Sequence, residues 1–190
     1  MINCIVTDSE GALSGSLRKL GCHVISCAPG GPFDLTDNLL ASDRIDLVVH
    51  TGCMEGYTLD PWDFDAAQAL YARVVQPPME LVRNILPRMT KSNMRRLCFF
   101  TSAKASINLC EDSGHYAFYM AHAALHMRLR ILHNELPDYA IKLYDPGEKP
   151  NADAIAQMLL RPAFAETADP TRNVDNHLLL MDWLGRAHPW

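Results

Sequence analysis

Polar rings recur along one face of a predicted helix. The segment that begins at His115 places His115, Tyr119, His122 and His126 at the spacing i, i+4, i+7 and i+11. In an α-helix this spacing puts all four side chains on one side. A histidine titrates near neutral pH and can take a proton from a hydroxyl group. A serine beside this stripe would therefore complete a pair suited to general-base or nucleophilic chemistry.

Metal binding and disulfide bonds are not expected. His122 and His126 stand four residues apart, as zinc ligands on a helix can, but no third ligand lies at a motif distance and no H-E-x-x-H signature is present. The six cysteines are scattered without a C-x-x-C pair, and several lie inside apolar runs. These features favour reduced thiols in a core.

Length, composition and charge narrow the class of protein. The chain has 190 residues, of which 48% are hydrophobic and 21% charged, and this indicates one globular domain over residues 1–190. A net charge of −5 leaves no basic surplus for a nucleic-acid partner. No apolar run approaches the ~20 residues needed to cross a bilayer, and the first residues lack a secretory signal pattern. We expect a cytoplasmic protein whose partner is a small molecule.

Short apolar runs alternate with helical patterns along the chain, which is typical of βαβ units and a parallel sheet. Pro77 and Pro78 predict a bend or a fresh start in the second helix. Residues 29–45 are too few for a strand and a full crossover helix. We predict a Rossmann-like, doubly wound α/β fold with helices on both faces and an abbreviated N-terminal half. The strands are expected within 3–7, 22–28, 46–52, 95–103, 140–147 and 176–183, and the helices within 8–21, 61–89, 115–135 and 152–162.

The turn after the first strand is a poor dinucleotide site. Such a turn binds a pyrophosphate through free backbone N–H groups at a helix N-terminus, and three glycines allow the close approach. Here Gly11 is the only well-placed glycine, and Asp8 and Ser14 stand where two others would help. Asp8 and Glu10 would also bring negative charge towards an anion. We expect an ordinary strand-to-helix turn and no bound cofactor.

Six segments occur in order along the chain: DLVVHTG, PPMELVRNILPRM, CFFTSAKASI, HYAFYMAHAALHM, YDPG and LLMDWLGRAHPW. Together they resemble the short-chain dehydrogenase/reductase superfamily, closest to its C-factor-like branch. The resemblance implies a fold that binds NAD or NADP and transfers hydride. It also implies a serine at a strand end, a tyrosine and a lysine four apart on the next helix, and an asparagine on the helix before.

Carried over residue by residue, the resemblance leaves most of this machinery altered. Ser102 takes the place of the serine, but Phe118 stands at the tyrosine, His122 at the lysine and Val74 at the asparagine. Neither Tyr116 nor Tyr119 projects along the direction of Phe118, because successive helical residues turn by about 100°. The family's first and last glycines correspond to Asp8 and Ser14. The resemblance therefore implies a relative without ordinary NAD(P)-dependent redox chemistry.

Three functions are compatible with these residues. The favoured hypothesis is cofactor-independent catalysis on a small metabolite, of lyase, isomerase or hydrolase type, with Ser102, His122 and Tyr119 as the candidate catalytic residues. In this hypothesis the polar stripe meets Ser102. The second hypothesis is a non-catalytic binding or scaffold protein, in which His122 and His126 are hydrogen-bonded within a core. The third is an atypical NAD(P)-dependent oxidoreductase.

An assembly of copies of this chain is also expected. The resemblance implies pairing through two long helices, here 78–89 and 115–133, and the second of these is rich in alanine and apolar residues. We expect a homodimer, or a larger assembly built from one. The ending GRAHPW, residues 185–190, is expected to pack against a neighbouring subunit or to cover the mouth of the pocket.

Overall fold

A single mixed sheet of seven strands forms the centre of the molecule. The computed structural model describes residues 1–8, 11–28, 44–52, 63–111, 114–161, 178–182 and 184–190. The sheet order is β2-β1-β3-β4-β5-β6-β7, with β7 antiparallel and all other pairs parallel. The strands are β1 (Asn3–Thr7), β2 (His23–Ser26), β3 (Leu47–His50), β4 (Arg96–Phe100), β5 (Ala140–Asp145), β6 (Leu179–Asp182) and β7 (Ala187–His188).

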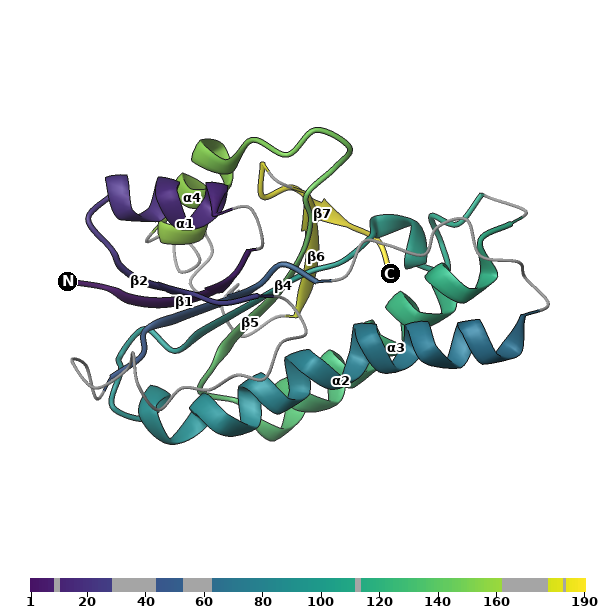
Figure 1. Cartoon of the computed structure of the whole chain (residues 1–190), viewed down its shortest axis with the longest axis horizontal. Helices are drawn as coiled ribbons and strands as arrows, with labels where there is room; N and C mark the ends of the chain where they lie inside the picture. Colours follow the sequence, from purple (N-terminus) through teal and green to yellow (C-terminus); the bar gives the residue numbers. More distant parts are fainter. Residues whose placement is uncertain (9–10, 29–43, 53–62, 112–113, 162–177, 183) are drawn as a thin grey trace.

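Helices cover both faces of this sheet, as Figure 1 shows. Helices α1 (Ala12–Lys19) and α4 (Ala152–Leu160) lie on one face, and α2 (Phe64–Met89) and α3 (Tyr116–Glu135) lie side by side on the other. β1, β3 and β4 are buried along their whole length, which explains their continuous apolar runs. Successive residues of β4 enter opposite layers, since Phe99 packs with α2 and α3 while Phe100 packs with α1 and α4. The predicted doubly wound α/β class is confirmed.

Of the two alternatives predicted at Pro77 and Pro78, a bend or a fresh helix start, the fresh start is wrong. Pro77 and Pro78 lie inside one continuous helix of 26 residues and do not start a new one. Each proline removes a helical hydrogen bond, which is costly in an isolated helix. Here the helix packs along α3, and Val74, Pro78 and Leu81 are buried, so tertiary packing offsets that cost. In the described part of the chain, no helix has an apolar stretch long enough to cross a membrane.

Strand β7 forms one edge of the described sheet, and β2 forms the other. The short strand β7 was not expected, because its two residues carry no strand pattern and pair only through contact with Leu180 and Met181. At the other edge, β2 is the outermost described strand. The segment between β2 and β3, where a turn and an abbreviated layer were predicted, lies within residues 29–43 and outside the described residues.

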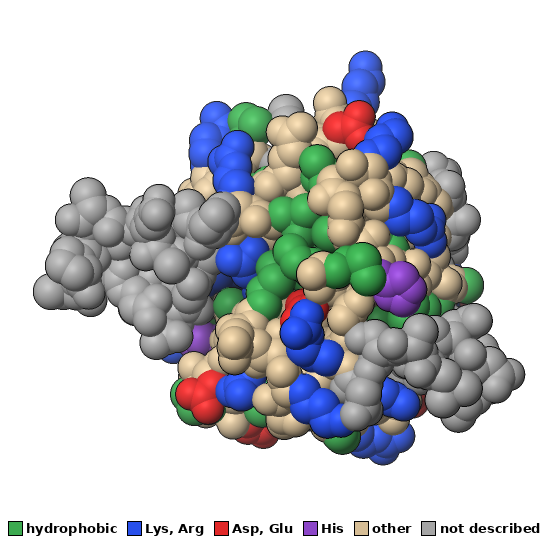
Figure 2. All heavy atoms as spheres, turned by 90° about the vertical axis from the view of Figure 1, so that its left-hand side faces the viewer, with side chains coloured by type: hydrophobic (Ala, Val, Ile, Leu, Met, Phe, Trp, Pro, Cys, Tyr) green, Lys and Arg blue, Asp and Glu red, His purple; other side chains and the backbone are tan. Residues whose placement is uncertain are grey.

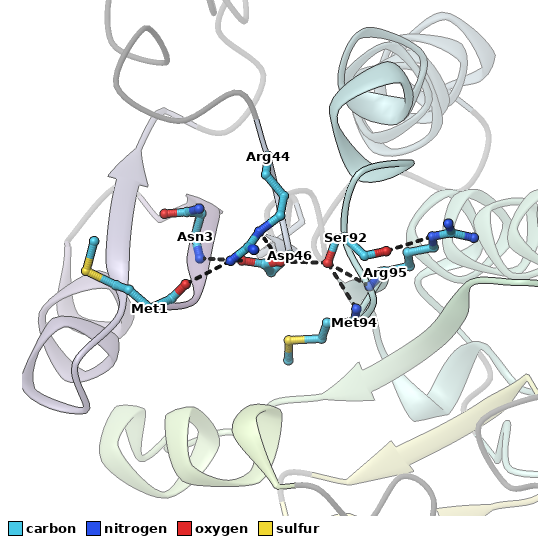
Figure 3. Close-up of polar contacts among 7 residues, drawn as sticks. All are labelled: Met1, Asn3, Arg44, Asp46, Ser92, Met94 and Arg95. Atoms are coloured by element: carbon cyan, nitrogen blue, oxygen red, sulfur yellow. Dashed lines mark hydrogen bonds and ion pairs between the residues drawn. The ribbon is translucent and has the colours of Figure 1, made fainter.

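The amino edge of the sheet is held together by one buried carboxylate (Figure 3). Asp46 accepts hydrogen bonds from the backbone N–H of Asn3 at 2.9 Å and from the Ser92 hydroxyl at 2.6 Å, and it pairs with Arg44 at 3.0 Å. These contacts join β1, the start of β3 and the α2–β4 connection. Figure 2 shows this end of the molecule, with Lys and Arg side chains spread over it and few acidic ones. The Asp46 carboxylate thus has a structural role, so we looked for a functional site at the carboxyl edge of the sheet.

Candidate functional site

The carboxyl edge contains the point where the strand order reverses, between β1 and β3. In open α/β sheets, ligands bind in the crevice at this point. Here the chain bridges it with its own polar groups. The backbone N–H of Thr51 donates to the Thr7 hydroxyl at 3.0 Å, and the Thr51 hydroxyl donates to the Thr7 carbonyl.

The first strand-to-helix turn is likewise occupied by a side chain. Asp8 accepts from the Ser14 backbone N–H at 2.8 Å, from the Ser14 hydroxyl at 2.6 Å and from the Ser26 hydroxyl at 2.8 Å. Gly11 adopts φ 67° at the N-cap of α1, a conformation that favours glycine. The predicted turn is therefore present. A carboxylate fills the anion-attracting end of α1, and Ser26, at the end of β2, is the long-range partner that sequence reasoning missed.

Two histidines of α3 meet on a threonine. The Thr101 hydroxyl lies 3.0 Å from His122 Nδ1 and 2.7 Å from His126 Nε2. Thr101 and His122 have no exposed surface, and His126 is 6% exposed. The predicted stripe is real, because Tyr119, His122 and His126 all lie on the buried flank of α3, and the His115 ring contacts that of Tyr119.

The stripe meets Thr101 and not Ser102, and the pleat of the sheet explains why. Successive residues of an extended strand point to opposite faces. Phe99 faces α3, so Thr101, whose N–H continues the ladder to Tyr144, faces it too. Ser102 is buried at 7% exposure and caps the 3-10 turn η1 (Ala103–Ala105). Within the described residues, the Ser102 side chain makes no hydrogen bond to either histidine.

The environment of this cluster fixes its charge. Burial, and secondarily the charge of His122, lower the pKa of His126 from 6.5 to about 4, so its ring is neutral at pH 7. The Thr101 hydroxyl has one proton and therefore donates to one ring and accepts from the other. One of the two ring nitrogens that face Thr101 is therefore an acceptor, and the other is a donor. The second ring nitrogen of His126, Nδ1, is an acceptor in one arrangement and a donor in the other.

The remaining predicted site positions belong to the core. Phe118 is 2% exposed, and its ring centroid lies 4.4 Å from that of His122, so it shields that ring from solvent. Tyr119 is buried beside Phe118 with ring centroids 5.7 Å apart. Val74 is 1% exposed in the same apolar cluster. The structure thus places Phe118, Tyr119 and His122 together and leaves Ser102 outside their contacts.

A pocket of about 390 Å³ lies beside His126, between η1, α3 and the end of the chain. Its walls are Ala105, Ser106 and Ile107 on one side, Ala123, Met127 and Arg130 on the other, and Trp190. The Trp190 ring meets the His126 ring edge-on at 5.7 Å. Figure 1 shows the C-terminus next to α3 at this edge. Of residues 185–190, which were expected to pack against a neighbouring subunit or to cover the pocket mouth, Trp190 forms part of the pocket wall within its own chain.

His50 is a further buried histidine at this edge, and it was not singled out in the sequence. Its Nδ1 accepts the Gly52 N–H at 3.1 Å, so Nε2 carries the proton, and this Nε2 has no hydrogen-bond partner among the described residues. Burial lowers the pKa of His50 to about 4. Elsewhere the five described cysteines, including buried Cys4 and Cys98, are free thiols, as predicted.

The strand order, the crossover helices on both faces and the strand-order reversal between β1 and β3 define a Rossmann-like α/β fold. No family model and no curated protein matches the chain. Solved structures do match over its full length. A putative short-chain alcohol dehydrogenase from Burkholderia multivorans aligns with a TM-score of 0.77 and 15% identity, covering 100% of this chain and 99% of that one.

Two further neighbours were solved with a nucleotide. A carbonyl reductase from Pseudomonas aeruginosa PAO1 in complex with NADP has a TM-score of 0.74 and 16% identity, with 100% of each chain covered. NADPH-bound carbonyl reductase from chicken fatty liver has a TM-score of 0.64 and 15% identity, covering 99% of this chain and 87% of that one. The chain therefore has the short-chain dehydrogenase/reductase fold.

Proposed function

We propose that this protein uses the short-chain dehydrogenase/reductase fold to bind a small molecule and does not carry out NAD(P)-dependent hydride transfer. The observation that carries the proposal is the Asp8 carboxylate on the Ser14 N–H at 2.8 Å. That N–H is one of the free donors at the start of α1 that would otherwise attract a pyrophosphate. A dinucleotide would have to displace a negative charge that already holds both Ser14 and Ser26.

The residues at the chemical end of the site also fit a nicotinamide poorly. Phe118, at the position of the family's tyrosine, has no hydroxyl group that could donate a proton. His122, at the position of the lysine, is fully buried and hydrogen-bonded to Thr101. These features support loss of the hydride-transfer step. They favour binding over catalysis by Ser102 and His122, because a ring shielded by Phe118 has no route to a substrate atom.

A second candidate is an atypical NADP-dependent reductase. The observation in its favour is the full-length similarity to carbonyl reductases whose structures hold NADP or NADPH. In that case the loop around Asp8 would rearrange on binding, and another group would supply the proton.

A thermal-shift titration with NADP(H) and NAD(H) separates the two candidates. A ligand present at 100 times its Kd stabilises a protein by about 2.7 kcal/mol, which raises the Tm of a chain of this size by several degrees. We expect no shift for this protein at millimolar nucleotide. The Pseudomonas aeruginosa carbonyl reductase, which was solved with NADP, is the positive control.

A double variant tests whether the turn between β1 and α1 is what prevents nucleotide binding. Asp8→Gly together with Ser14→Gly removes the carboxylate and restores glycine at both family positions. If Asp8 is the obstacle, this double variant gains a nucleotide-dependent shift that the wild type lacks. A saturable stabilisation of the wild type by either nucleotide would contradict the proposal.

A further inference from the structure

We propose that the pocket beside His126 binds an aromatic carboxylic acid, with its ring against Trp190 and its carboxylate on Arg130. This inference rests on the proposed small-molecule binding and names the ligand class. It does not depend on the absence of a dinucleotide, because none of the described residues that line the pocket belongs to β1, α1 or the turn between them.

The side chains that line the pocket favour a flat, apolar ligand. Ile107 is 90% exposed, Met127 63% and Trp190 41%, and these three side chains line the pocket together with Ala105 and Ala123. A concave group of exposed apolar side chains with few polar atoms is typical of a small-molecule site. The volume of about 390 Å³ suits a single-ring compound. The indole of Trp190 offers a face or edge for such a ring.

Arg130 supplies the one Lys, Arg, Asp or Glu side chain among the described residues that line the pocket. It is exposed, and within the described residues its guanidinium forms no ion pair. Its neighbour Arg128, by contrast, lies 3.9 Å from Glu135. A guanidinium binds a carboxylate in a bidentate manner, which fixes orientation as well as charge. The pocket therefore favours an anion over a neutral compound of the same shape.

His126 is the titratable ring among the described residues that line the pocket. The ring is 6% exposed, and Thr101 holds its Nε2 at 2.7 Å, so its orientation is fixed before a ligand arrives. Nδ1 remains available, as donor or acceptor according to the tautomer that Thr101 sets. A hydroxyl or carbonyl group on the aromatic ring would match either state.

The wall formed by Trp190 is held in place. The Ser106 hydroxyl donates to the Pro189 carbonyl at 2.8 Å, and the Asn108 side-chain amide donates to the Trp190 carbonyl. The start of η1 is fixed in turn, because the Ala103 N–H donates to Asp145 at 2.8 Å. The pocket is thus built by hydrogen bonds between segments distant in sequence, and such pre-organisation lowers the entropic cost of binding.

Isothermal titration with 4-hydroxybenzoate tests the proposal, with 4-hydroxybenzamide as the neutral compound of the same shape. We expect saturable binding of the acid and at least about tenfold weaker binding of the amide. Arg130→Gln should weaken the acid by about tenfold and leave the amide within about twofold. Arg128→Gln is the matched control, two residues earlier and on nearly the opposite side of the helix, and it should change neither affinity. Trp190→Leu should weaken both compounds and remove the ligand-dependent change in tryptophan fluorescence.

Each alternative result has a definite meaning. The ligand proposal is overturned by no saturable binding of the acid at about 10 mM, by equal affinity for acid and amide, or by equal losses in Arg130→Gln and Arg128→Gln. The titrations are repeated with NADP present. If NADP binds and the acid also binds, the proposed loss of redox function fails and the pocket assignment stands. If neither binds, the pocket assignment fails alone.

Discussion

Thr101 is the residue on which the histidine cluster depends. Its hydroxyl satisfies a ring nitrogen of His122 and one of His126, both deeply buried. Thr101→Val keeps the shape and leaves two buried polar nitrogens without this partner, so we expect a loss of about 2–3 kcal/mol in the free energy of unfolding. Urea denaturation measures it. Ser102→Ala, next in the chain, should cost less than about 1 kcal/mol, and equal losses would show that Ser102 shares the structural role.

Buried neutral histidines also make stability depend on pH. The pKa of His126 and that of His50 fall from 6.5 to about 4 on burial. Between these values the unfolded chain binds more protons than the folded one, so the free energy of unfolding decreases as pH falls from 6.5 towards 4. Each ring contributes up to roughly 3 kcal/mol to that decrease.

Denaturation at pH 7.5 and at pH 4.5 checks this expectation. His126→Gln should flatten the pH dependence by about the contribution of one ring, at some cost in stability at neutral pH. A slope that His126→Gln leaves intact would contradict a buried neutral His126.

At the scale of elements, the order of strands and helices could be predicted from sequence because it follows from local patterns. Continuous apolar runs such as β3, Leu47–His50, are buried on both faces, and periodic segments such as α3 bury one flank. The uninterrupted helix α2 and the two-residue strand β7 could not be predicted so, because both depend on partners distant in the chain.

The candidate site shows the same division. The shared face of Tyr119, His122 and His126 follows from helical spacing alone. Identifying their hydrogen-bond partner requires knowing which face of the sheet α3 covers. The alternation of side chains along β4 and beyond it places Thr101, and not Ser102, on that face. Neither the Asp8–Ser26 hydrogen bond nor the Trp190 wall leaves a local pattern, since each joins residues that only the completed fold brings together.

The amino edge gives a prediction about how elements are joined. Asp46 is 5% exposed and binds Asn3, Arg44 and Ser92. Asp46→Ala removes the acceptor and leaves a buried N–H and an arginine without it, so we expect a loss of about 3 kcal/mol or more. Asp153→Ala, whose carboxylate is largely exposed, should cost less than about 1 kcal/mol in the same denaturation experiment. Similar losses for the two variants would contradict this role of Asp46.

At the scale of the whole molecule, the surface of α3 bears on assembly. Tyr116, Met120, Met127 and Ile131 are 50%, 68%, 63% and 42% exposed and lie on one helical face, which the pocket beside His126 borders at Met127. Tyr71 of α2 is 46% exposed. In the 78–89 half of α2 the exposed positions are mainly polar. We propose that the homodimer expected from the sequence pairs through α3 and the earlier half of α2, because a contiguous apolar face of this kind favours burial against a second copy.

Light scattering after size exclusion tests this pairing. We expect a mass about twice the 21.2 kDa of one chain. Met120→Arg combined with Ile131→Arg places two charges at the centre of an apolar interface, where like charges from both copies face each other, and should give a folded monomer. Leu184→Arg, an equally hydrophobic exposed position on the β6–β7 turn, is the control and should remain dimeric. A wild type with the mass of one chain would show that the protein does not form this dimer. A double variant that stays dimeric would show that the two copies pair through another surface, because two arginines from each copy cannot be buried against each other on this face.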